Sequence, residues 1–258
     1  MSTTVQDLAG AAALVVGGTG RIGSAVCRRL AARGAFVVVH YRGAPARARD
    51  LVDEVGGPGA AMAVHADLDR PGAAGGLVAA AAAGPGRLDV LVSTAHPQFA
   101  PTPVADLTDE EVDLHLRAMR AHIDLCRAAV PVLAGGGTGR IVLVSGALAT
   151  RALPGCALYS AAKAGLHAFH RGLALEVGRA GITVNAVAPG RVDPQDERPP
   201  TDAHAQWQQL EGDPQDRRAF PDPPTADQVA AAIDVFVGPG AGALTGQVLY
   251  LAQGEVMA

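Results

Sequence analysis

A short apolar run, from Ala11 to Val16, leads directly into the glycine-rich sequence GGTGRIG at positions 17–23, and a segment with helical periodicity follows up to Ala32. Glycines at such a turn let the backbone approach a pyrophosphate, whose negative charge is attracted by the N–H groups at the start of the helix. A strand, a glycine turn and a helix in this order predict a dinucleotide-binding unit. The cofactor contacts expected from this turn are Gly17, Thr19, Gly20, Arg21 and Ile22.

The rest of the chain alternates between short apolar runs and longer segments with helical periodicity. Strands are expected at 36–41, 61–65, 88–93, 140–145, 182–187 and 247–251, and helices at 46–55, 73–83, 109–133, 159–180 and 226–237. Alternation with short connections predicts an α/β fold, a doubly wound parallel sheet with helices on both faces, in a single domain over residues 1–258. A ligand is expected at the carboxyl ends of the strands.

The end of the second strand indicates which dinucleotide is bound. An acidic residue there binds the ribose 2′-hydroxyl of NAD(H), whereas a basic residue accommodates the 2′-phosphate of NADP(H). Here the residues are His40, Tyr41 and Arg42, with no acid. The sequence therefore favours NADP(H), with Tyr41 and Arg42 as contacts and Arg21 as a second positive charge. The alternative is that Arg42 is an ordinary surface residue.

Lys163 is the only lysine among the 21 basic residues of the chain. An ammonium is a compact point charge that a guanidinium does not replace. Tyr159 lies four residues earlier, so on a helix the two side chains share a face. A cation beside a phenol lowers the pKa of the phenol, and the pair therefore predicts a general acid/base device. The alternative is a chance coincidence of helical spacing.

Composition narrows the classes of partner. The net charge is −4 with dispersed arginines, so no basic stripe for nucleic acid is expected. The apolar runs are shorter than a membrane span, and no basic residue precedes the first of them as in a secretory signal. The three cysteines lack metal-ligand spacing, which predicts buried thiols in a reducing compartment and no metal. We expect a cytoplasmic protein that acts on a small-molecule substrate.

Residues 191–224 break the alternation, because Pro, Asp, Gln and Arg dominate this stretch. Trp207 lies within a short expected helix at 203–210. A long polar insertion after a strand end predicts a lid over the substrate. The alternative is a disordered surface loop.

Five motifs follow one another along the chain: the glycine turn, Asp67-Leu68, Tyr159 with Lys163, NAVAPG at 185–190 and LTGQ at 244–247. In the order and spacing of these motifs the sequence resembles the short-chain dehydrogenase/reductase family. The resemblance implies a Rossmann-type fold, proton donation by Tyr159 to a carbonyl oxygen during hydride transfer, and a Lys163 that holds the ribose hydroxyls. It also implies a homo-oligomer, a tetramer or dimer, because relatives associate through their long helices. The remaining implied cofactor contacts are Asp67, Leu68, Thr94, Ala95, Tyr159, Lys163, Pro189, Gly190 and Val192. Arg21 in the glycine turn, followed by residues 40–42, resembles the pteridine reductase-like, NADPH-using branch.

The sequence departs from the family pattern in its catalytic tetrad. The family usually carries a Ser thirteen residues before the Tyr, where this chain has Gly146, and a helix Asn where it has Ala118. Ser145 is adjacent, but neighbours on a strand point to opposite faces. Ser145 and His96 are the candidate replacements in the catalytic set. His122, one helical turn after Ala118, is a further imidazole that can form a proton relay. The alternative for each His is a structural or surface role.

Three functions follow from this pattern. The first is an NADP(H)-dependent carbonyl or imine reductase. The second is non-redox chemistry on the same scaffold, such as dehydration, isomerisation or cyclisation of a biosynthetic intermediate. The third is a protein that binds NADP(H) without turning it over. The intact Tyr159 and Lys163 favour chemistry, whereas Gly146 and Ala118 argue against ordinary reduction.

Overall fold

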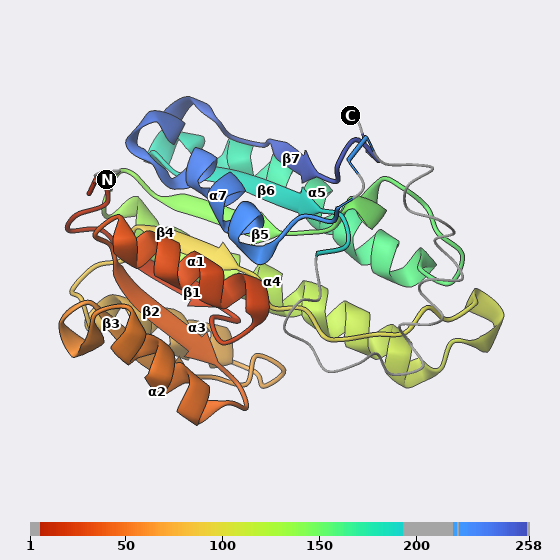
Figure 1. Ribbon diagram of the computed structural model, residues 1–258, viewed down its shortest axis with the longest axis horizontal. Helices are drawn as coiled ribbons and strands as arrows, with labels where there is room; N and C mark the ends of the chain where they lie inside the picture. The colour runs from red at the N-terminus through yellow and green to blue at the C-terminus, as the bar shows by residue number, and fades with distance from the viewer. Residues whose placement is uncertain (1–5, 193–218, 221, 257–258) are drawn as a thin grey trace.

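A computed structural model describes residues 6–192, 219–220 and 222–256. Its centre is a seven-stranded sheet in the order β3-β2-β1-β4-β5-β6-β7, and every pair of neighbours is parallel (Figure 1). Along the chain the strands are β1 (Ala12–Val16), β2 (Phe36–Tyr41), β3 (Ala61–His65), β4 (Val90–Ser93), β5 (Arg140–Val144), β6 (Thr183–Pro189) and β7 (Val248–Leu251). The predicted doubly wound α/β sheet is confirmed.

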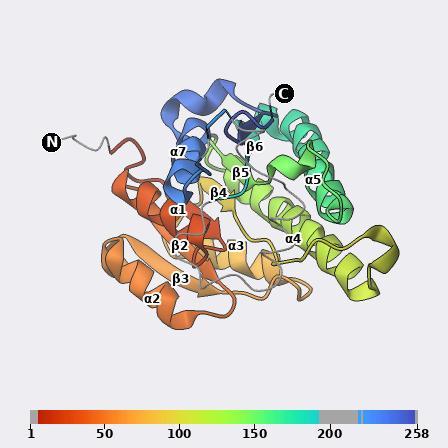
Figure 2. The ribbon, with the colours of Figure 1, turned by 45° about the vertical axis from the view of Figure 1, so that its right-hand side comes forward.

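The helices cover both faces of this sheet, as the turned view shows (Figure 2). Helices α1 (Arg21–Ala32), α2 (Pro45–Glu54) and α7 (Ala226–Val237) lie on one face. Helices α3 (Ala73–Ala83), α4 (Asp109–Ala134) and α5 (Ala157–Val177) lie on the other. Short 3₁₀ segments are η1 (Gly57–Gly59), η2 (Val104–Asp106), η3 (Ala147–Ala149), η4 (Gly178–Ala180) and η6 (Pro239–Ala243).

The strand sequences explain why both faces are covered. In β1, Ala13 and Val15 pack into one core cluster with α1 and α7, while Leu14 and Val16 pack into the other with α3 and α4. Successive side chains of a strand point to opposite faces, so an uninterrupted apolar run needs cover on both. All five residues of β1 are buried.

Two element boundaries differ from the sequence prediction in ways that matter for the site. Helix α5 begins at Ala157 and not at Tyr159, so Tyr159 lies inside its first turn. Strand β6 runs on to Pro189, which pairs with Leu251 of β7. Pro189 has no N–H to donate, and as the last residue of β6 it marks the end of the strand.

Most of the predicted lid lies outside the described residues, including Trp207 and the short helix expected at 203–210. Within the described part of the chain, no helix combines the length and the apolar composition needed to cross a membrane.

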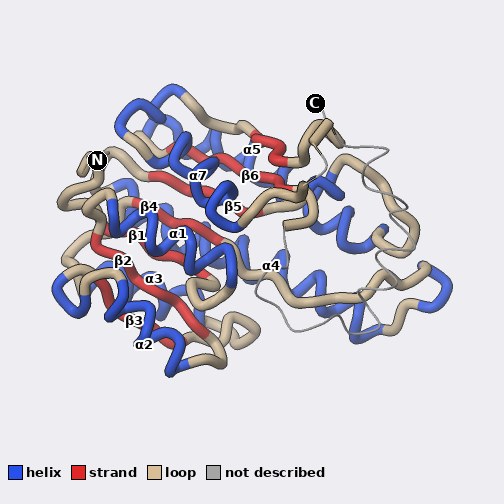
Figure 3. Tube along the Cα trace, viewed as in Figure 1, coloured by secondary structure: helices blue, strands red, loops and turns tan. Residues whose placement is uncertain are grey.

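The sheet is extended in opposite directions from the two neighbouring strands β1 and β4. Figure 3 shows the strands in red with helices on either side. After β1 the chain builds outward through β2 to β3, and after β4 it builds outward through β5 and β6 to β7. The loops that leave β1 and β4 therefore diverge, and a crevice opens at their carboxyl ends.

Candidate active site

The glycine turn closes tightly against the end of β4. Gly17 has a φ of +77°, and a Cβ added to it would lie 2.8 Å from Thr94 Oγ1. Thr94 Oγ1 in turn donates to the carbonyl oxygen of Val16 at 2.9 Å. A Cβ on Gly23 would overlap the carbonyl oxygen of Gly17. Gly17 is required because of its positive φ, and Gly23 is required because backbone atoms fill the space where its Cβ would go.

His40 holds the turn in place from the neighbouring strand. The N–H of Gly17 donates to His40 Nδ1 at 3.0 Å, so His40 Nε2 carries the proton and donates to the Ala66 carbonyl oxygen at 3.0 Å. Burial lowers the pKa of His40, which keeps the ring neutral, as this pair of contacts requires. The sequence argument used His40 only as a non-acidic residue and missed this role.

The crevice at the strand ends is a cavity of about 640 Å³. It is lined by most of the predicted cofactor contacts, namely Gly17, Thr19, Gly20, Arg21, Ile22, Tyr41, Arg42, Leu68, Thr94 and Ala95. Its far wall is helix α4, through Leu114, Ala118, Ala121, His122 and Leu125. The α1 N-terminus and two arginines at one cavity fit a phosphate-bearing dinucleotide.

Other predicted cofactor contacts lie outside this lining. The Asp67 carboxylate pairs with Arg70 at 3.3 Å, and the cavity is lined by Asp69 instead. Asp69 lies 3.4 Å from the guanidinium of Arg42, at an exposed rim. Pro189 and Gly190 line a second cavity beside Tyr159, and Val192 is buried in the core.

Tyr159 and Lys163 share one face of α5, as their spacing predicted. Lys163 Nζ lies 5.7 Å from the centre of the Tyr159 ring and 3.5 Å from the Val144 carbonyl oxygen. Burial lowers the pKa of Lys163 to about 8. Burial also raises the pKa of Tyr159, which is the opposite of the expected lowering by the lysine. Loss of hydration disfavours each charged form, and here it outweighs the attraction between the two groups.

An aromatic cluster surrounds Tyr159. Phe99 is stacked on its ring with the centroids 4.6 Å apart, and His96 and His115 meet it edge-on at 5.0 and 6.1 Å. His115 comes from α4 and was not identified from the sequence. Its spacing of seven residues from His122, two helical turns on one face, was the available signal.

His96 packs on Tyr159, yet its hydrogen bonding does not fit the donor role that the sequence argument gave it. Its Nδ1 bonds the Pro97 carbonyl oxygen at 2.7 Å, so Nδ1 carries the proton. Burial and the nearby Lys163 lower the pKa of His96 to about 3, which keeps the ring neutral. Among the described residues Nε2 has no hydrogen-bond partner, and in the neutral ring this nitrogen is an acceptor.

Ser145 does not replace the missing serine in this arrangement. Its hydroxyl lies 2.7 Å from His167 Nε2 in a buried contact, and Ser145 does not line the cavity beside Tyr159. Gly146 occupies the serine position, and a Cβ there would overlap the Tyr159 hydroxyl. The phenol therefore fills the volume that a side chain at position 146 would need.

This overlap predicts the effect of adding a side chain at Gly146. Gly146→Ala should displace the Tyr159 hydroxyl and lower turnover by about 10²-fold, a loss typical of a 1 Å misplacement, with unchanged NADPH affinity. Gly146→Ser causes the same displacement but adds a donor, so it should retain more activity than the alanine variant. Steady-state kinetics and NADPH titration of both variants measure this. Wild-type turnover in Gly146→Ala would show that the observed phenol position is not the reactive one.

A second cavity of about 240 Å³ lies beside the Tyr159 hydroxyl. Its walls are Phe99, Gly146, Ala147, Leu148, Arg151, Tyr159, Pro189, Gly190, Arg191 and Glu255. Arg151 and Glu255 form an ion pair at 2.8 Å, with the Glu255 side chain 3% exposed. The site thus combines a large cavity, a buried phenol and lysine, and a smaller cavity with largely apolar walls that include the Arg151–Glu255 ion pair.

Comparisons with known proteins agree with this arrangement. A family profile described as enoyl-(acyl carrier protein) reductase matches residues 18–255. The chain is 37% identical to a hydroxynaphthalene reductase-like protein of Metarhizium majus over 192 residues, which are 73% of this chain and 71% of that protein. It is 34% identical to a D-beta-hydroxybutyrate dehydrogenase of Rhizobium meliloti over 183 residues, 70% of each chain.

Solved structures share the whole fold. A short-chain dehydrogenase from Burkholderia cenocepacia in complex with NADP superimposes with a TM-score of 0.86 at 36% identity, over 96% of this chain and 99% of the other. A blue fluorescent protein from a metagenomic library, in complex with NADPH, gives a TM-score of 0.84 at 31% identity, over 97% and 100%. With the family profile, these similarities show that the chain belongs to the short-chain dehydrogenase/reductase family of NAD(P)-dependent oxidoreductases.

Proposed function

We propose that the chain is an NADP(H)-dependent reductase of a small carbonyl or imine compound, with Tyr159 as general acid/base. The observation that carries the proposal is the position of the buried Tyr159 and Lys163. Tyr159 lines the second cavity, and its ring packs against His96, which lines the first. A cofactor in the first cavity and a substrate in the second would meet at the phenol.

The residues of the chain supply the proton and the local charge. Bound NADPH would supply the hydride. Because burial raises its pKa, Tyr159 carries its proton at neutral pH and can donate it to the substrate oxygen or nitrogen. The Lys163 ammonium then stabilises the phenolate, since charges interact strongly where water is excluded. Arg21 and Arg42 would hold the cofactor phosphates, and the N–H groups at the start of α1 would face the pyrophosphate.

The second cavity supports a compact and largely apolar substrate. Its volume of about 240 Å³ is below the usual range for drug-sized ligands, and Phe99 and Leu148 line it. The Metarhizium relative carries the name of a hydroxynaphthalene reductase-like protein. We therefore propose a ketone with one ring or two fused rings.

The proposal is tested by following NADPH absorbance with a panel of bicyclic aromatic ketones, quinones, pterins and acetoacetate. Oxidation with ketones supports a carbonyl reductase, and preference for pterins supports the pteridine reductase-like branch. NADPH binding without oxidation across the panel would contradict the proposal.

Gly146 and Ala118 favour two other functions. One is redox-neutral chemistry at Tyr159, and the other is binding of NADP(H) without turnover. Loss of a hydrogen-bond donor to a developing oxyanion lowers turnover by about 10²- to 10³-fold. Product analysis by mass spectrometry in the NADPH assay distinguishes the candidates. Dehydration or isomerisation changes the product without consuming the nucleotide.

Cofactor choice is tested with Arg42→Ala. A charge-assisted hydrogen bond to the 2′-phosphate contributes about 1.5–3 kcal/mol, so NADPH affinity should fall about 10- to 100-fold while NADH affinity stays unchanged. Fluorescence titration measures both. Arg28→Ala is the control, because Arg28 pairs with Glu54 and does not line the cofactor cavity. An equal loss for NADPH and NADH would mean that Arg42 does not read the 2′-phosphate.

Self-association through α4 and α5 is also proposed. Leu116 on α4 and Leu175 on α5 are 52% and 86% exposed, so each helix carries an apolar side chain that a second subunit would cover. Light scattering measures the mass in solution, and a monomer would contradict this proposal.

A further inference from the structure

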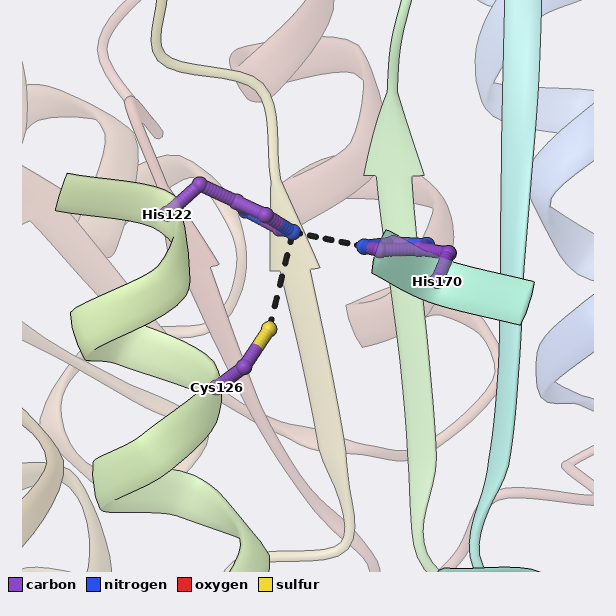
Figure 4. A group of neighbouring side chains, drawn as sticks. All are labelled: His122, Cys126 and His170. Carbon is purple, nitrogen blue, oxygen red and sulfur yellow. Dashed lines mark hydrogen bonds between the residues drawn. The ribbon is translucent and has the colours of Figure 1, made fainter. Parts of the chain in front are cut away.

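Two imidazoles and a thiol meet in the core behind the cofactor cavity. His122 and Cys126 lie one turn apart on α4, and His170 faces them from α5 (Figure 4). The two Nε2 atoms are 2.6 Å apart, and Cys126 Sγ lies 3.5 Å from His122 Nε2. All three residues are buried, and their ligand atoms lie within 4.8 Å of one another. The described residues add no carboxylate to this group.

The two imidazoles cannot face each other as lone pairs. Burial lowers the pKa of both rings, so both are neutral at pH 7. At 2.6 Å, either the Nε2–H of one ring donates to the Nε2 lone pair of the other, or both lone pairs face a cation. A thiol beside them supplies the third ligand of a metal site. Thiolate and imidazole together select zinc or copper(I), whereas magnesium and calcium prefer oxygen.

We propose that His122, Cys126 and His170 bind a single zinc(II) or copper(I) ion. In a tetrahedral zinc site the nitrogen–nitrogen edge is about 3.3 Å and the sulfur–nitrogen edge about 3.5 Å. The sulfur–nitrogen edge to His122 already has this length. The two Nε2 atoms would have to separate by less than about 1 Å, and Cys126 Sγ, within 4.8 Å of the His170 ligand atom, would have to approach it to about 3.5 Å.

Charge favours copper(I) of the two ions. With the Cys126 thiolate, copper(I) makes a neutral three-ligand centre, and zinc carries a net positive charge and needs a fourth ligand. Lys163 is a positive charge that already acts on His122. Zinc would therefore take a water molecule as its fourth ligand from the cofactor cavity, which His122 lines.

The number of protons released when the metal binds follows from the protonation of the three ligands. Each neutral imidazole keeps one proton, which in the bound state lies on Nδ1. The Cys126 thiol forms its metal–sulfur bond as a thiolate and releases one proton to the solvent. Neither ion changes its oxidation state, so the step needs no oxidant or reductant.

The test is an anaerobic titration of the full chain, freed of metal by chelation, with Zn²⁺ and with Cu⁺ in separate arms against a competing chelator. We expect one equivalent of at least one ion, and release of about one proton per ion by calorimetry in two buffers. Co²⁺ serves as a spectroscopic probe of the zinc arm, and a thiolate-to-cobalt charge-transfer band would show that a cysteine is one of the ligands. Absence of stoichiometric binding in both arms would overturn the proposal.

Variants assign the ligands. Cys126→Ala and His170→Phe should weaken binding by at least about 100-fold, because each removes a direct ligand. Cys27→Ala is the matched control, since Cys27 is an equally buried free thiol on α1. Unchanged affinity in the folded Cys126→Ala variant, or an equal loss in Cys27→Ala, would overturn the assignment. These readouts need neither cofactor nor substrate, so they stand apart from the reductase assay.

Discussion

Tyr159→Phe should abolish most of the reductase activity while leaving the nucleotide bound. The variant keeps the ring that Phe99, His96 and His115 contact and removes only the hydroxyl. A general acid contributes about 10²- to 10⁴-fold to turnover, and we expect a loss in this range with NADPH affinity within twofold of wild type. Turnover comes from NADPH consumption with an active ketone, and affinity comes from fluorescence titration.

Tyr250→Phe is the matched control for this result. Tyr250 lies on β7, where its hydroxyl contacts Thr150, and it lines neither described cavity. Its removal should leave turnover unchanged. If Tyr159→Phe retained wild-type turnover, proton donation would have to come from another group, and the reductase mechanism proposed above would be wrong.

Gly23→Ala should remove nucleotide binding. A methyl group at Gly23 would overlap the carbonyl oxygen of Gly17, so α1 and the glycine turn must separate. The shift moves the turn and the helix N-terminus that would hold the pyrophosphate. We expect NADPH affinity to fall by at least about 10²-fold, a loss typical of a displacement near 1 Å. Fluorescence titration measures the affinity, and circular dichroism reports whether the variant is folded.

Gly75→Ala provides the control for this substitution. Gly75 lies within α3, and a Cβ added there meets nothing within 4 Å. Alanine in a helix is favoured over glycine by about 1 kcal/mol, so this variant should bind NADPH normally and unfold at a slightly higher temperature. Normal NADPH binding by Gly23→Ala would show that the glycine turn does not determine cofactor affinity.

The fold could be predicted from the sequence because the residues of each strand are enough to recognise it as a strand. The strands are built on apolar runs, as in all of β1 and the first four residues of β2, and glycine turns or helices separate them. Each of these elements can be recognised from its own residues. The alternation of strands and helices then leaves few topologies, because crossovers between parallel strands are right-handed.

The site could be predicted where its residues lie close together in the sequence. The glycine turn and the Tyr159–Lys163 pair are contiguous motifs, and their geometry follows from a turn or from one helix face. The prediction of Asp67 as a cofactor contact was harder to make. In the turn after β3, Asp69, two residues later, lines the cavity, and Asp67 does not. Side-chain direction in an irregular turn has no period from which it can be predicted.

The sequence by itself determined the parallel sheet, the position of the glycine turn, and the pairing of Tyr159 with Lys163. Only the tertiary structure decided which residues surround them. The contact of His40 with Gly17 and the pair of His122 with His170 join residues 23 and 48 positions apart. The tertiary structure also decided that the pKa of Tyr159 is raised and not lowered. The sequence shows the neighbouring cation, but desolvation depends on how many distant segments exclude water from the phenol, and it sets the sign.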